Sequence, residues 1–145
     1  MRYEIAKLAA AKYRSLLFME EPMPVYNNAL PPLSLFPGDV GYSFNSETLP
    51  TSASAGAQFA LTNPSGFASD DRTVRWQTIF ATAPSAVNVQ LQGAMADVDA
   101  EYATVDTSTN TAGEARTVAG VRANFLRIKV TSATGGSTFT AKMLP

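Results

Sequence analysis

Apolar and polar residues alternate along several short segments of the chain. In VNVQLQ, at residues 87–92, Val87, Val89 and Leu91 are separated by amide side chains. In FLRIKV, at residues 125–130, Arg127 and Lys129 are separated by apolar residues. A period of two places successive side chains on opposite faces of a β-strand. Each segment is therefore predicted to be a strand with one buried face and one face in water.

Further segments of this kind recur at regular spacing. They are AQFALT (57–62), TVRWQTIF (73–80), EYATVDT (101–107), GEARTVAGV (113–121) and STFTAKML (137–144). Turn signals separate them, including NPSG at 63–66 and ATGG at 133–136, where Gly135 and Gly136 predict a hairpin turn. Roughly seven or eight such strands predict a mainly β fold, an antiparallel β-sandwich or jelly roll.

The only tryptophan of the chain, Trp76, lies in one of these segments and shares a face with Val74 and Phe80. This alternation predicts that Trp76 belongs to the core. The alternative is an exposed indole that stacks on a sugar ring or anchors an interface.

Residues 1–21 have the period of a helix instead. Apolar residues fall on one stripe, at Ile5, Leu8, Ala9, Tyr13, Leu16 and Leu17. The run of alanines at 9–11 favours helix, and Pro22 ends it. We expect a short helix that packs on protein, because its stripe has few bulky residues and its polar face carries mixed charge, unlike a membrane-surface helix.

The next stretch, EPMPVYNNALPPLSLFPG at residues 21–38, contains five of the nine prolines of the chain. Proline at this density blocks helices and sheet ladders and favours an extended backbone. The chain is thus predicted to have an N-terminal arm at residues 1–37 and a β-sandwich domain at residues 38–145. The predicted partner-binding residues are the apolar side chains of the arm: Val25, Tyr26, Leu30, Leu33, Leu35 and Phe36.

Composition excludes several classes of function. The chain has no cysteine and no histidine, which removes disulfides, thiolate chemistry and the commonest general base. No enzyme activity and no cofactor are expected. A net charge of −1 gives no long-range attraction to nucleic acid or to an anionic membrane. Charged residues interrupt the apolar residues of the N-terminus, so no secretion signal or membrane span is predicted, and synthesis in a cytoplasm is expected.

Two clusters of acidic residues could serve a chemical function. Carboxylates at alternate positions, as in Asp97, Asp99 and Glu101, can converge on calcium, although the glycine and distal glutamate of an EF-hand loop are missing. A solvated hairpin loop is the favoured interpretation. The adjacent pair Asp70 and Asp71 is interpreted as part of a turn rather than as catalytic carboxylates.

Four cations, Arg116, Arg122, Arg127 and Lys129, surround Phe125 and would suit a nucleic-acid face. The acidic residues Asp97, Asp99, Glu101 and Asp106 precede them closely. Cross-strand or intersubunit ion pairs are therefore the favoured interpretation.

Residues 86–136, with VRWQTIFATAPS (74–85) before them, resemble a pattern found in small structural proteins of tailed bacteriophages. In that pattern a strand ending in LQGS is followed by a TxDTST…GE.RTV stretch and an RYLRV strand. The matching residues are 91–93, 107–109, 113–114, 116–118 and 125–128. An Asp-Gly-Trp turn of that pattern is replaced here by residues 97–102, which contain neither glycine nor tryptophan, so sugar binding is not carried over.

The resemblance implies a discoidin-like or jelly-roll sandwich and a place on the outside of a virion capsid. It implies a decoration (cement) protein that binds the major capsid protein and forms a homo-oligomer, a dimer or trimer. A stiff apolar arm suits such a clamp, because extended chain covers roughly 3 Å per residue. Two alternatives stay open: a carbohydrate-binding module of a tail fibre or baseplate, and a head–tail connector or neck component.

Overall fold

The structure, a computed structural model, describes residues 33–36, 38–61 and 72–145. The described strands are β1 (Leu33–Leu35), β2 (Gly41–Thr48), β3 (Ser54–Leu61), β4 (Arg72–Phe80), β5 (Ala86–Ala94), β6 (Ala103–Ser108), β7 (Ala115–Val121), β8 (Phe125–Thr134) and β9 (Thr138–Leu144). One 3₁₀ turn, η1 (Asp99–Glu101), precedes β6. The predicted N-terminal helix, the anchors Val25, Tyr26 and Leu30, and the pair Asp70 and Asp71 lie outside the described residues.

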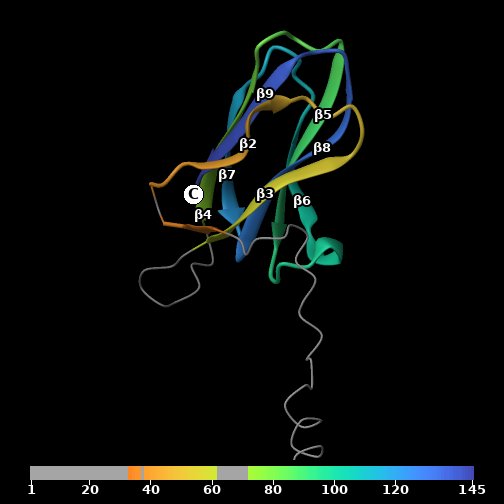
Figure 1. Cartoon of the computed structure of the whole chain (residues 1–145). Coiled ribbons are helices and arrows are strands. Elements are labelled where there is room, and N and C mark those ends of the chain that lie inside the picture. The colour runs from red at the N-terminus through yellow and green to blue at the C-terminus, as the bar shows by residue number, and fades with distance from the viewer. Residues whose placement is uncertain (1–32, 37, 62–71) are drawn as a thin grey trace, which may run out of the picture.

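The strands form two sheets (Figure 1). One has five strands in the order β1-β3-β8-β5-β6, and the other has four in the order β2-β9-β4-β7. β1 runs parallel to β3, and every other described pairing is antiparallel. The prediction of a mainly β fold with antiparallel sheets is confirmed.

The pairing of the eight strands after β1 is nested along the chain. β2 pairs with β9, β3 with β8, β4 with β7 and β5 with β6. The first of these strands thus pairs with the last, the second with the last but one, and so on inward. Among the described strands, only β5 and β6 are neighbours both in the sequence and in a sheet.

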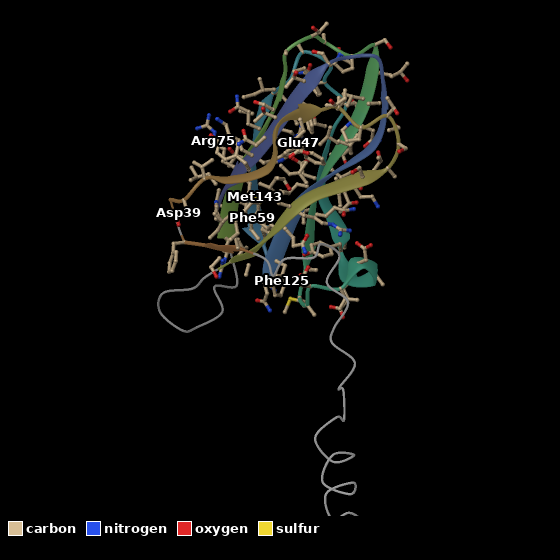
Figure 2. All side chains as sticks on the ribbon, in the orientation of Figure 1. Asp39, Glu47, Phe59, Arg75, Phe125 and Met143 are labelled. Atoms are coloured by element: carbon tan, nitrogen blue, oxygen red, sulfur yellow. The ribbon has the colours of Figure 1, made fainter. Side chains whose placement is uncertain are left out.

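One hydrophobic core takes side chains from both sheets. The five-stranded sheet contributes Leu91, Leu126 and Ile128, and the four-stranded sheet contributes Trp76 and Phe139, all essentially without exposure. The labelled Phe59 and Met143, one from each sheet, lie in the interior of the molecule in Figure 2. Burial of alternate side chains in both sheets supplies the main apolar driving force for this fold.

All seven segments predicted from alternation are strands, with ends shifted by a few residues. The prediction that Trp76 belongs to the core is confirmed, because 1% of the residue is exposed. β2 was not predicted, since its buried residues do not alternate: Ser43 and Phe44 are adjacent and both buried. Register shifts interrupt its pairing with β9 at this point.

The prediction of a hairpin at Gly135 and Gly136 is wrong. Both glycines have positive φ, as a tight turn requires. The strands that they join, β8 and β9, belong to different sheets and do not pair. The turn is a corner that carries the chain from one sheet to the other.

No helix among the described residues is long and apolar enough to cross a membrane.

Candidate functional site

The predicted anchors that the structure describes lie on β1 and directly after it. Leu33 is 69% exposed and Phe36 is 50% exposed, whereas Leu35 is buried in the core of its own chain. β1 pairs with β3 in the five-stranded sheet, so residues 33–35 are part of the folded unit although they were predicted to belong to the arm. Leu33 and Phe36 remain available to a partner, and Leu35 does not.

Two further apolar side chains extend this exposed area. Val40 is 49% exposed and Tyr42 is 43% exposed. We call Leu33, Phe36, Val40 and Tyr42 the root surface, because the proline-rich stretch joins the strands here. A groove of about 470 Å³ runs beside it, with Leu33, Val40, Tyr42 and Phe59 among its lining residues.

A tight turn between β1 and β2 lies at the root surface and fixes the backbone there. The backbone N–H of Asp39 donates to the carbonyl of Phe36 at 3.0 Å, and the Asp39 carboxylate accepts from the N–H of Phe36 at 3.2 Å. Gly38 at the centre has a φ of +93°, which L-residues rarely adopt. The turn gives the backbone N–H groups of Phe36 and Asp39 hydrogen-bond partners and leaves the Phe36 side chain outside the core.

A second groove, of about 190 Å³, meets the first at Val40. It is lined by Val40, Arg75, Trp76, Gln77, Lys142, Met143 and Leu144. None of these residues is acidic, and two are cations. Arg75 is exposed, and Figure 2 shows its side chain pointing away from β4 into solvent. The Lys142 ammonium lies 5.9 Å from the centre of the Tyr42 ring, which places a cation beside the root surface.

The acidic loop between β5 and β6 does not gather its carboxylates at one point. Asp97 accepts hydrogen bonds from the Tyr102 hydroxyl at 2.7 Å and from the Gln58 amide at 3.3 Å. Asp99 pairs with Arg127, and Glu101 accepts from the backbone N–H of Ala96 at 3.2 Å. No group of three or more metal-ligating side chains occurs among the described residues. The loop connects a true hairpin, as predicted, but it binds its own sheet rather than facing only solvent.

The Asp99 partner, Arg127, lies under this loop and is only 2% exposed. Its guanidinium donates to the Gln92 side chain at 3.0 Å and stacks on the Tyr102 ring at 3.8 Å from the ring centre. Desolvation and the hydrogen bond to Asp97 raise the pKa of Tyr102 well above its ordinary value. The prediction that Arg127 faces water is therefore wrong, because the loop at residues 95–102 covers the outer face of the sheet here.

A second polar cluster joins the two sheets at the edge formed by β6 and β7. The Asp106 carboxylate accepts from the Trp76 indole at 2.9 Å and from two nitrogens of Arg116 at 2.7 and 2.9 Å. Glu114 accepts from the Ser108 hydroxyl at 2.6 Å and from Arg116 at 3.2 Å. The predicted ion pairs are confirmed for Arg116 and Arg127.

These contacts set the charge state of the second cluster. Burial alone would raise the pKa of Asp106, but the hydrogen bonds from Arg116, Trp76 and the backbone of Thr107 outweigh it and hold the pKa below its usual value. The hydrogen bond from Ser108, aided by Arg116, lowers the pKa of Glu114. These acids are ionised partners in a structural network.

Sequence reasoning missed Val40, Tyr42, Arg75 and Lys142. Val40 and Tyr42 alternate with Gly41 and Ser43, but a period of two would place these apolar side chains in the core, whereas both are exposed. No sequence signal brings Arg75 and Lys142 together, because their strands are far apart in the chain and adjacent only in the sheet.

Comparison with protein families, with curated proteins and with solved structures found no match for this chain.

Proposed function

We propose that the chain is a capsid decoration protein of a tailed bacteriophage, whose two sheets form a jelly-roll β-sandwich. The nested strand pairing supports the fold assignment, because a jelly roll winds an eight-stranded hairpin so that its first strand pairs with its last. β1 is then an added edge strand. Jelly rolls occur in viral capsid proteins and also in lectins, so the fold alone does not decide the function.

The observation that carries the functional proposal is the root surface. Four large apolar side chains are exposed at the place where a stiff, proline-rich apolar stretch enters the fold. An exposed apolar patch of this kind marks an interaction site. The other exposed large apolar side chains among the described residues are Ile79 on β4 and Met95 and Val98 on the β5–β6 loop. The apolar residues Val25, Tyr26 and Leu30 precede the root surface in the sequence and would add to the binding surface. On a capsid this surface would bind the major capsid protein at the shell exterior.

The alternative of a sugar-binding module depends on exposed aromatic rings. Trp76 and Tyr102 are buried, and Phe125 is half-buried. The two rings named first therefore offer no free face for stacking on a sugar. Phe36 and Tyr42 do have exposed rings, but these lie with Leu33 and Val40 on the apolar root surface, which suits a protein partner better than a carbohydrate.

The first test is the number of copies in purified phage particles, measured by quantitative mass spectrometry. A decoration protein is expected at on the order of hundreds of copies, because it follows the symmetry of the shell, whereas a connector ring has about a dozen. Absence from the particles would refute the proposal, and a ring-like number would favour the neck component.

Binding of the purified full chain to empty shells of the major capsid protein tests the surface itself. Replacing Leu33 and Phe36 together by serine should weaken binding roughly 100-fold, because each buried side chain contributes about 1.5 kcal/mol or more. The matched control is Met95→Ser, since Met95 is 63% exposed and lies on the distant β5–β6 loop. Equal binding by all three proteins would contradict the role of the root surface.

A further inference from the structure

We propose that residues 20–30 of one copy of this chain bind the two joined grooves of a second copy. The acidic residues Glu20 and Glu21 lie at Arg75 and Lys142, and the apolar residues that follow them cover the root surface. This inference concerns the same arm as the proposed function. It predicts an association of two copies in solution, with no shell present, so either idea can fail without the other.

The two grooves lie next to each other on the surface and share one lining residue. Val40 lines both grooves, so the apolar groove beside Leu33 and Tyr42 adjoins the cationic groove beside Arg75 and Lys142 at this residue. An occupant must therefore be an extended chain with an acidic part and an apolar part. The only acidic residue in the lining of either groove is Asp39, which lies in the apolar one. This charge directs the acidic part of an occupant to the opposite groove.

The chain itself contains a segment of this kind. Glu20 and Glu21 are followed by Pro22, Met23 and Pro24, and then by VYNNAL at residues 25–30. Prolines at alternate positions favour an extended backbone, and they reduce the entropy lost on binding. The acidic residues thus come first in the segment and the apolar residues follow, which matches a cationic groove next to an apolar one.

The neighbouring copy is the favoured recipient because of the sequence next to β1. Pro31 and Pro32 stand directly before Leu33, the first residue of β1. Folding back onto its own grooves would require a reversal at this dipeptide. Proline is disfavoured at the second central position of a type I turn, and a type II turn needs a positive φ there that proline lacks. The same dipeptide therefore disfavours binding of the segment to the grooves of its own copy.

Thiol cross-linking in a protein without native cysteine tests the inference directly. One full-length variant carries Met23→Cys in the segment, and another carries Gln77→Cys in the cationic groove, beside Lys142 in the sheet register. All the proposed charges stay in place. When the two single variants are mixed with a short thiol-to-thiol cross-linker, a covalent dimer containing one chain of each is expected. The control replaces Gln77→Cys by Thr82→Cys, an exposed site beyond the far end of β4, which should give no such dimer.

Charge exchange supplies the second measurement. Arg75→Glu with Lys142→Glu should lower the yield of the mixed dimer roughly tenfold or more, because like charges then face each other. Adding Glu20→Lys and Glu21→Lys to the partner chain should restore it. Thermal unfolding checks that each variant is folded. No mixed dimer, or a double-cysteine chain that links only within itself, would overturn the inference, and so would a yield insensitive to the exchanged charges.

Discussion

Ser43 is a buried polar residue that joins the two sheets. It lies on β2 in the four-stranded sheet, yet its hydroxyl donates to the carbonyl of Ala57 at 2.6 Å and accepts from the N–H of Ile128 at 2.9 Å, both in the five-stranded sheet. The β3–β8 pairing shifts register between Ala55 and Gln58, so these two backbone groups lie where the ladder is interrupted. A hydroxyl, which both donates and accepts, satisfies the two of them at once.

The neighbouring Gly56 explains how β2 comes so close. A Cβ at Gly56 would lie 2.2 Å from the Ser43 carbonyl oxygen, so only glycine permits this approach. Removal of the hydroxyl in Ser43→Ala should lower the free energy of unfolding by about 2 kcal/mol, because two buried backbone groups lose their partner. Denaturant unfolding measures the change. Ser52→Ala, at an exposed position, should change the free energy by less than about 0.5 kcal/mol, and equal effects at both sites would contradict this role for Ser43.

At the scale of elements, the loop at residues 95–102 depends on a charge held under it. Arg127 links the loop to the sheet through Asp99, Gln92 and Tyr102. The Asp99 side chain is 65% exposed, so this pair is weaker than one that is fully buried. The arginine nonetheless fixes the loop, because its guanidinium binds a carboxylate, an amide and an aromatic face together.

Arg127→Met should therefore lower the free energy of unfolding by roughly 2 kcal/mol and speed amide hydrogen exchange in residues 95–102. The control is Lys129→Met, two residues along the same face of β8 and half-buried, for which little change is expected. Hydrogen-exchange mass spectrometry measures the protection of the loop amides in both variants. Unchanged protection of the loop in Arg127→Met would show that the arginine does not hold it.

Arg127 also shows where sequence reasoning reaches its limit. Alternation correctly placed Val87, Val89 and Leu91 in the core, since the period of two reports which face of a strand a side chain occupies. It does not report what covers the other face, so Arg127 was predicted to lie in water. Turn residues have the same limit, because glycines with positive φ join two strands equally well within a sheet or between sheets.

The candidate site was partly predictable for the same reason. Leu33 and Phe36 were predicted to be anchors from their apolar, proline-rich surroundings, and both side chains are exposed. The cations Arg75 and Lys142 were not predicted, because the groove that they share exists only once β4 and β9 pair.

At the scale of the whole molecule, Asp106, Glu114 and Arg116 join the sheets along one edge. The folded state holds the pKa of both carboxyl groups below their ordinary values. A lowered folded pKa means that ionisation favours folding, so this stabilisation is present above the unfolded pKa of about 4 and is lost as the pH falls through the folded value.

Asp106→Asn should consequently destabilise the protein at neutral pH by roughly 2 kcal/mol, a modest figure because Arg116 is partly exposed. The loss should shrink as the pH falls below about 4, because the unfolded chain then binds a proton at Asp106 while the folded protein still holds this carboxyl group ionised, and the charge-based stabilisation is lost progressively. Unfolding free energies at pH 7 and pH 3 give the comparison. Glu101→Gln is the control acid, since it makes one surface hydrogen bond, and a loss in Asp106→Asn that is the same at both pH values would contradict the charge-based account.

The position of β9 has a consequence for how the molecule is made. β9 lies between β2 and β4 in the four-stranded sheet. Without β9 the two strands are not connected, and β2 has no partner in that sheet. A ribosome produces β2 and β4 well before it releases β9, the strand that joins them. Nascent chains must therefore keep β2, and the edge of β4 that does not face β7, unpaired and exposed to other chains until β9 has been made, and long-range closure of this kind is slow. Slower translation should prolong this exposure rather than help folding, and a chain stalled before residue 138 should be far more prone to aggregation than the finished protein.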